Sequence, residues 1–215
     1  MRQPLYGEAI SRMPLENKES IKVFEMKLPI IAYGDPILKR KGIEINRDYP
    51  DLPELIANMF ETMYAAHGVG LAAPQVGLAI RLFVIDASPF ADDDPALKDF
   101  KKVFINAEIL EEEGEKWSFN EGCLSIPEIR EDISRYPNIR IRYVDENWVT
   151  HEEDFTGLAA RIIQHEYDHI EGKLFTEKLS PLRKAMIKSK LEAISKGQVD
   201  VDYKMKFPLL KRKGR

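Results

Sequence analysis

The chain has 215 residues, of which 44% are hydrophobic and 32% are charged, a composition typical of a globular protein with one core of ordinary size. No stretch approaches the roughly 18 uncharged apolar residues that span a bilayer, which excludes a membrane protein. Cys123 is the single cysteine, which excludes a disulfide scaffold and favours a reducing cytoplasm. The formal net charge of −4 does not indicate a DNA-binding protein.

The N-terminal segment, residues 1–25, contains four glutamates and no uninterrupted apolar core, which argues against a signal peptide and a transit peptide. We expect it to be a poorly ordered extension. Met26 stands just before the apolar run 28–32, and our hypothesis is that translation begins there. The folded domain is then expected over residues 26–197, followed by a basic C-terminal tail at 198–215.

Residues 52–66 place apolar side chains at spacings of three and four, the pattern of an amphipathic helix. Asp51 is available as its N-cap, and Gly68 lies just past its end. After a glycine-rich turn, the sequence changes to short runs that are typical of strands. These expected strands span residues 79–87, 103–110, 116–120, 139–144 and 148–155.

Two further helices are expected in the C-terminal part. One runs from about Thr156, as its N-cap, to Gly172, and it is apolar around much of its first half, so it must be buried. The other begins at Ser180 and Pro181, where serine caps and proline occupies the first turn, and it stops near Gly197. Because helices and strands do not alternate, we predict an α+β fold with short, mostly antiparallel strands around the central buried helix and with a C-terminal helix.

The buried helix carries His-Glu-Tyr-Asp-His at residues 165–169, which puts two imidazoles about one turn apart on one face with a glutamate between them. This is the spacing of metal ligands. The alternative is a pair of hydrogen-bonded core histidines beside a surface glutamate. We disfavour it because two imidazoles and two carboxylates would be costly to bury in an apolar helix without a compensating ion.

A catalytic metal site needs three protein ligands and one open position, and Cys123 is the obvious third ligand beside His165 and His169. It directly follows an expected strand, and Gly122 would let the backbone approach another element closely. A solitary cysteine is more often a small buried hydrophobe, but a helix with two candidate ligands reverses that preference. A thiolate with two imidazoles suits zinc or ferrous iron, and the residue types do not decide between them.

Residues 68–75, Gly-Val-Gly-Leu-Ala-Ala-Pro-Gln, form a loop in which the main chain can pass close to a ligand. The loop lacks the Gly-Lys-Ser/Thr ending of a phosphate-binding loop and does not follow a strand, so a nucleotide site is not expected. Gln75 is its only functional side chain, and an amide can donate to a developing oxyanion. A helix cap with a tight turn is the simpler alternative.

The segments 68–75, 121–125 (Glu-Gly-Cys-Leu-Ser) and 164–169 (Gln-His-Glu-Tyr-Asp-His) resemble, in the same order, the three signature motifs of the peptide deformylase family. The similarity extends from about Pro29 to the Leu-Ser-Pro-Leu stretch at 179–182. The resemblance implies a metal-dependent hydrolase that removes the formyl group from the N-terminal formylmethionine of nascent polypeptides, in the cytoplasm of a bacterium or in an organelle.

The same resemblance implies roles for individual residues. Cys123, His165 and His169 would bind the metal, with iron(II) expected and zinc, nickel or cobalt as substitutes. Glu166 would act as general base and then as general acid, because it lies beside the ligands without being one of them.

The resemblance also implies that Gln75 and the backbone N–H of Leu124 bind the oxyanion, and that Gly70 contacts the peptide main chain. A methionine side chain needs an unbranched apolar slot beside the metal. Three residues are candidates for this slot, although ordinary core packing explains them equally well: Val69, Leu158 and Ile162.

Two sets of charges leave alternatives open. Glu121, if buried, requires a cation or hydrogen bonds, and Arg140, Arg142 and Arg161 are all available. Residues 204–215 carry six basic residues and no acid, which would allow a transient contact with ribosomal RNA, although a solvated tail is favoured.

Two other functions compete with deformylation. A zinc endopeptidase needs only the H-E-x-x-H helix and would cleave internal peptide bonds, but Cys123 argues against it. A non-catalytic metal-binding protein would keep the ligands and need neither Glu166 nor Gln75. We expect a monomer that acts on formylmethionyl nascent peptides, with neither DNA nor a membrane as partner.

Overall fold

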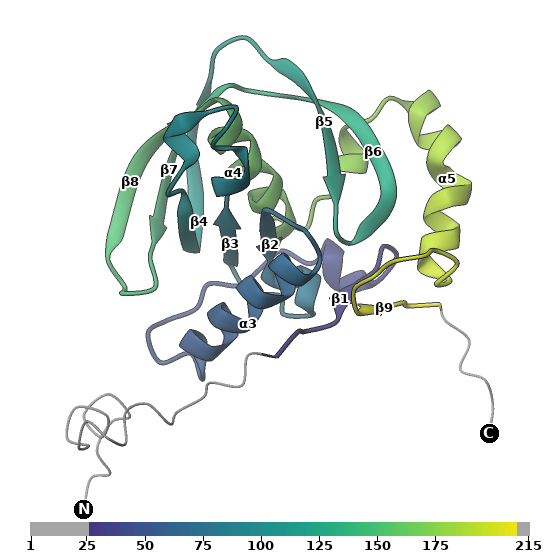
Figure 1. Ribbon diagram of the computed structural model, residues 1–215, viewed down its shortest axis with the longest axis horizontal. Helices are drawn as coiled ribbons and strands as arrows, with labels where there is room; N and C mark the ends of the chain where they lie inside the picture. The colour runs from purple at the N-terminus through teal and green to yellow at the C-terminus, as the bar shows by residue number, and fades with distance from the viewer. Residues whose placement is uncertain (1–25, 210–215) are drawn as a thin grey trace, which may run out of the picture.

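The computed structural model describes residues 26–209, whose elements are shown in Figure 1, so the expectations for residues 1–25 lie outside the described part. The helices are α3 (Leu52–Ala65), α4 (Gly157–Ile170) and α5 (Pro181–Ser195). The strands are β1 (Ile30–Ile31), β2 (Gly70–Ala72), β3 (Leu82–Asp86), β4 (Lys101–Glu113), β5 (Trp117–Cys123), β6 (Ile126–Arg135), β7 (Asn138–Val144), β8 (Thr150–Thr156) and β9 (Met205–Lys206). Among the described residues, no helix combines the length and apolar character needed to cross a bilayer.

An antiparallel sheet with the strand order β2-β3-β4-β7-β8 forms the centre of the fold. Both faces of β3 are buried: Leu82 and Val84 pack in a cluster with α3, whereas Phe83 and Ile85 pack in a cluster with α4. This explains why β3 is an uninterrupted apolar run rather than an alternating one. The helix that the sequence predicts to be buried thus covers one face of the sheet, and α3 covers the other.

Strands β5 and β6 form a separate antiparallel hairpin on the side of the sheet that faces α5 (Figure 1). A third apolar cluster lies where β6, α5 and β1 meet. Strand β6 is not predicted from the sequence, for a physical reason. Its buried positions alternate with exposed ones, but two of them carry Glu131 and Arg135, which hides the apolar period.

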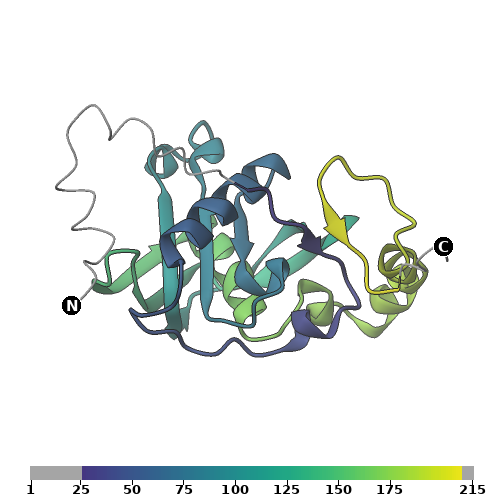
Figure 2. The same ribbon diagram turned by 90° about the horizontal axis from the view of Figure 1, so that it is seen from below.

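After α5 the chain returns to the body of the protein. Gly197 has a φ of +71°, and β9 then pairs in parallel with β1, with Ile30 opposite Met205 (Figure 2). Residues 198–209 of the expected tail therefore pack against the domain instead of extending into solvent, and residues 210–215 lie outside the described part. Two-residue strands have no periodicity, so the sequence alone does not reveal this pairing.

The α+β fold class is confirmed. Each of the five predicted strands is present, as β3, β4, β5, β7 and β8, and their ends differ from the prediction by at most three residues. The buried helix and the C-terminal helix are also present, and the sheets are antiparallel except for the β1–β9 pair.

The helix ends agree with the sequence only in part. Ser180 Oγ accepts a hydrogen bond from the Arg183 N–H at 3.3 Å, and Pro181 occupies the first turn of α5, as predicted. Asp51 and Thr156 also occupy the predicted N-cap positions of α3 and α4, but their side chains make no capping hydrogen bond. Asp51 instead has a φ of +52°, which turns its side chain away from the capping arrangement.

Candidate active site

Three side chains that are far apart in the sequence converge on one point. His165 and His169 belong to α4, and Cys123 ends β5. The Cys123 Sγ and His169 Nε2 atoms are 3.3 Å apart, and the three ligand atoms lie within 4.8 Å of one another. Donors that share one zinc or iron ion, with bonds of about 2.0–2.3 Å, lie roughly 3.3–3.8 Å apart. The Cys123–His169 separation falls in that range, and the types of the three donors suit such a metal. The chain thus contains a possible metal site of one cysteine and two histidines.

The surroundings act differently on the two histidines. Burial would lower the pKa of His165, but its hydrogen bonds with Cys123 and Glu121 outweigh burial and raise the pKa to about 10. His165 Nδ1 lies 3.0 Å from Glu121 Oε2, and a proton donated along this contact leaves Nε2 of the ring to face a metal. Burial lowers the pKa of His169 well below its ordinary value, which keeps this imidazole in the neutral form that binds metals.

A buried network of charges holds Glu121 in place. Arg135 binds it through two hydrogen bonds, Nε to Oε1 at 2.7 Å and Nη2 to Oε2 at 2.9 Å, and Arg161 Nη1 donates to Oε1 at 2.7 Å. Arg135 Nη1 also donates to Asp168 Oδ2 on α4 at 2.7 Å. Burial alone would raise the pKa of Glu121, but the hydrogen bonds from His165 and Arg135 outweigh it and hold the pKa far below its usual value. The carboxylate therefore stays charged and orients His165.

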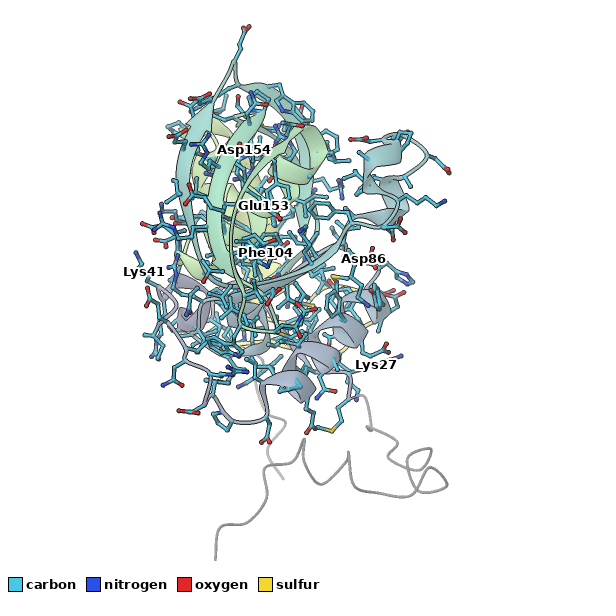
Figure 3. All side chains as sticks on the ribbon, turned by 90° about the vertical axis from the view of Figure 1, so that its left-hand side faces the viewer. Lys27, Lys41, Asp86, Phe104, Glu153 and Asp154 are labelled. Atoms are coloured by element: carbon cyan, nitrogen blue, oxygen red, sulfur yellow. The ribbon has the colours of Figure 1, made fainter. Side chains whose placement is uncertain are left out.

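The partners of Glu121 differ from those considered in the sequence analysis. Arg161 is one of the partners, but Arg140 and Arg142 do not bind Glu121. They lie on β7, where Arg140 pairs with Asp154 and Arg142 pairs with Glu152 of β8. Figure 3 shows β8 at the edge of the sheet that faces the viewer, with Asp154 labelled. Sequence reasoning misses Arg135 because this residue ends β6, the strand that was not predicted.

A cleft of about 790 Å³ opens beside the candidate ligands. Its walls come from the loop before β2, the β5–β6 hairpin, α4 and residues 200–203. All of the residues that the sequence analysis selected for the site line the cleft, apart from the buried His169: Val69, Gly70, Gln75, Cys123, Leu124, Leu158, Ile162, His165 and Glu166.

Glu166 combines burial with an unused oxygen. The residue is 5% exposed, its Oε2 atom has no hydrogen-bond partner among residues 26–209, and burial raises its pKa to about 7. Gly70 packs directly against it, because a Cβ at that position would lie 2.3 Å from Glu166 Oε1. A carboxyl group in this state can accept a proton near neutral pH and return it.

The Gln75 amide is oriented by the backbone. Its Oε1 atom accepts a hydrogen bond from the Ala72 N–H at 2.8 Å, which directs Nε2 toward Ser125 Oγ at 3.3 Å and Cys123 Sγ at 3.5 Å. Leu124 lies between those two residues, in the turn from β5 to β6. The side-chain donor of Gln75 therefore lies against the turn that contains Leu124.

The apolar part of the cleft is larger than the sequence analysis anticipates. Val69, Leu158 and Ile162 line it and pack on the cluster between α4 and the sheet, and Phe90 and Phe119 also line it. Phe119 had a detectable signal, because it lies four residues before Cys123 and so on the same face of a strand. Phe90 follows β3 in a short 3-10 turn, where no periodic pattern marks it.

Comparison with known proteins gives consistent matches. A family model described as polypeptide deformylase matches residues 27–185. A peptide deformylase of Christiangramia forsetii is 63% identical over 194 residues, which cover 87% of this chain and 99% of that protein. One from Flavobacterium johnsoniae is 59% identical over 194 residues, with the same coverage of 87% and 99%. The crystal structure of peptide deformylase from Thermotoga maritima superposes with a TM-score of 0.65 and 38% identity, covering 73% of this chain and 99% of that chain.

Proposed function

Because the chain belongs to the peptide deformylase family, whose members remove the N-terminal formyl group from nascent polypeptides, we propose how the residues of its cleft divide this reaction among them. The chain is an enzyme of protein biosynthesis, a hydrolase that acts on formylated nascent peptides. The observation that carries the proposal is the convergence of Cys123, His165 and His169 beside the unpartnered carboxylate of Glu166.

Cys123, His165 and His169 would hold the metal of this metal-dependent family. We propose iron(II) as the native ion, as the resemblance to the family implies. Zinc, nickel or cobalt could substitute for it, because one thiolate and two imidazoles suit all of these ions. A bound divalent ion supplies Lewis acidity, which polarises a carbonyl group and eases the deprotonation of water. Glu121 keeps His165 oriented for this role through its hydrogen bond to Nδ1.

Glu166 would move the proton. It takes a proton from the water whose oxygen bonds to the formyl carbon, and it later delivers that proton to the amine nitrogen as the carbon–nitrogen bond breaks and formate leaves. Gln75 Nε2 and the Leu124 N–H would donate to the oxyanion that forms in between. Both donors are held by the protein before the substrate arrives, so little reorganisation is needed during the reaction.

The apolar residues of the cleft would select the substrate. Val69, Leu158 and Ile162, together with Phe90 and Phe119, offer an apolar slot for the unbranched methionine side chain. The Gly70 main chain would contact the peptide backbone. A formyl group is only a carbonyl that bears a hydrogen, so a cramped site admits it and excludes larger acyl groups.

The test is formate release from a formyl-Met peptide by the metal-loaded full chain, with the same unformylated peptide as comparison. Glu166→Ala should slow formate release by about 10²–10⁴-fold while the bound metal is retained. Glu192→Ala, which changes an exposed glutamate on α5, is the matched control and should behave as the wild type. Cleavage of internal bonds in the unformylated peptide would instead indicate an endopeptidase, and full activity of Glu166→Ala would refute the assigned base.

The setting of the reaction is also part of the proposal. We take the catalytic domain to begin at residue 26 and, beyond the predicted end at 197, to include the packed residues 198–209; the proposed N-terminal extension at 1–25 lies outside the described residues. We further propose a cytoplasmic monomer whose basic C-terminal residues are solvated, with a transient contact with the ribosome as the alternative. Sedimentation of the purified chain, and salt-sensitive cosedimentation with ribosomes, would test the last two points.

A further inference from the structure

The turn between β5 and β6 is not of the kind that two-residue hairpins usually adopt. It consists of two residues, Leu124 and Ser125, between the paired Cys123 and Ile126. Two-residue hairpin turns ordinarily use Gly, Asn or Asp with positive φ angles. Neither Leu124 nor Ser125 has a positive φ, so the turn lacks the twist that matches the flanking strands, and contacts from other segments can help to fix it.

Each carbonyl of this turn accepts a hydrogen bond from a distant part of the chain. The N–H of Tyr33, two residues after β1, donates to the Ser125 carbonyl oxygen at 2.8 Å. The hydroxyl of Tyr203 donates to the Leu124 carbonyl oxygen at 2.9 Å. The two donors come from chain segments that are joined to each other: Tyr33 follows β1, Tyr203 precedes β9, and β1 pairs with β9.

Tyr203 belongs to the segment that returns from α5, which we call the C-terminal strap (residues 196–209). The strap is fixed where the Ile30 N–H donates to the Lys204 carbonyl oxygen at 2.8 Å and where β9 pairs with β1 (Figure 2). Residues 200–203 line the cleft. The Tyr203 ring packs in the same apolar cluster as Leu124, so the hydroxyl is held in its place by packing.

The protonation of Tyr203 suits a donor. Burial raises the pKa of its hydroxyl, and the nearby Cys123 and Asp202 raise it further. The hydroxyl therefore stays protonated at any pH at which the protein works, and it donates to the Leu124 carbonyl throughout.

We propose that Tyr203 is a positioning residue for the hydrolysis, which fixes the Leu124 carbonyl and, through the two-residue turn, the direction of the Leu124 N–H. The inference rests on the proposed role of that N–H in binding the oxyanion. An oxyanion donor acts mainly in the transition state. Loosening the turn should therefore lower kcat and leave the KM of a short substrate almost unchanged.

The experiment replaces Tyr203 with phenylalanine, which removes the hydroxyl and keeps the ring. With the metal-loaded full chain and a formyl-Met-Ala substrate, Tyr203→Phe should lower kcat by about three- to tenfold, the loss expected for one neutral hydrogen bond, with KM unchanged. Metal content should stay the same, and hydrogen exchange should accelerate at residues 123–126 and not elsewhere. Tyr49→Phe is the matched control, because Tyr49 packs on the same cluster without lining the cleft.

Several results would overturn the inference: an unchanged kcat in Tyr203→Phe, a rise in KM alone, or an equal loss in Tyr49→Phe. The Gln75→Ala variant distinguishes a failure of the role proposed for Tyr203 from a failure of the proposed function. If Gln75→Ala loses activity while Tyr203→Phe does not, the oxyanion assignment stands and the role of Tyr203 is refuted. A metal-loaded wild-type chain that releases no formate refutes the proposed function and the role of Tyr203 with it.

Discussion

Replacing Gly70 with alanine places a methyl group against the carboxylate of Glu166. The new Cβ would lie 2.3 Å from Glu166 Oε1 and 2.7 Å from its carboxyl carbon, whereas non-bonded atoms settle at about 3.5 Å. The carboxylate must therefore move by about 1 Å. Gly70 pairs with Ile85 in the sheet and has no positive φ, so alanine itself suits the backbone at this position.

The displacement should harm the reaction more than the fold. A misplacement of about 1 Å in a catalytic group typically costs about 10²-fold in rate, so kcat/KM should fall by about that factor. The methyl group meets the buried side chain of Glu166, including its Cγ at 2.8 Å, and no backbone atom, so the loss of stability should fall within the roughly 1–3 kcal/mol typical of overpacking. Metal content should be unchanged, because none of the candidate ligands lies among the atoms nearest to the new Cβ.

The measurements are formate release, urea unfolding and metal analysis on Gly70→Ala, on Glu166→Ala and on the double variant. In the Glu166→Ala background the methyl group no longer displaces a carboxylate, so adding Gly70→Ala should cost no further activity. Full activity of the single variant, or an equal loss in both backgrounds, would refute this account of the glycine.

Three further outcomes follow from the same structure. Arg135→Met leaves Glu121 and Asp168 without their shared cation, so the free energy of unfolding measured in urea should fall by about 3–5 kcal/mol. Metal affinity, measured by competition with a chelator, should fall about 10–100-fold. Met59→Ala removes a fully buried side chain and should cost about 2–5 kcal/mol by urea unfolding, with unchanged kcat for the folded fraction. Arg140→Ala breaks an exposed ion pair and should leave the melting temperature unchanged, and a loss like that of Arg135→Met would contradict the ranking by burial.

Local patterns account for the parts of the site that sequence reasoning brings together. The spacing of His165 and His169 depends only on the geometry of a helix, so the residues lie on one face wherever that helix packs. The apolar first half of α4 likewise requires burial, and burial is what raises the pKa of Glu166. Phe119 lies four residues before Cys123 in β5 and lines the same cleft, a placement that the period of a strand indicates.

The amino-acid sequence by itself indicates which side chains are candidates for the chemistry, and it predicts the α+β class and the burial of α4, because each of these follows from residue type and short-range period. Only the tertiary structure decides that Arg135 rather than Arg140 or Arg142 pairs with Glu121, and that Tyr203 reaches the carbonyl of Leu124. These contacts join residues of different elements, and the partners are chosen by how those elements pack. No local period records such a choice, since it emerges only when the whole chain has folded.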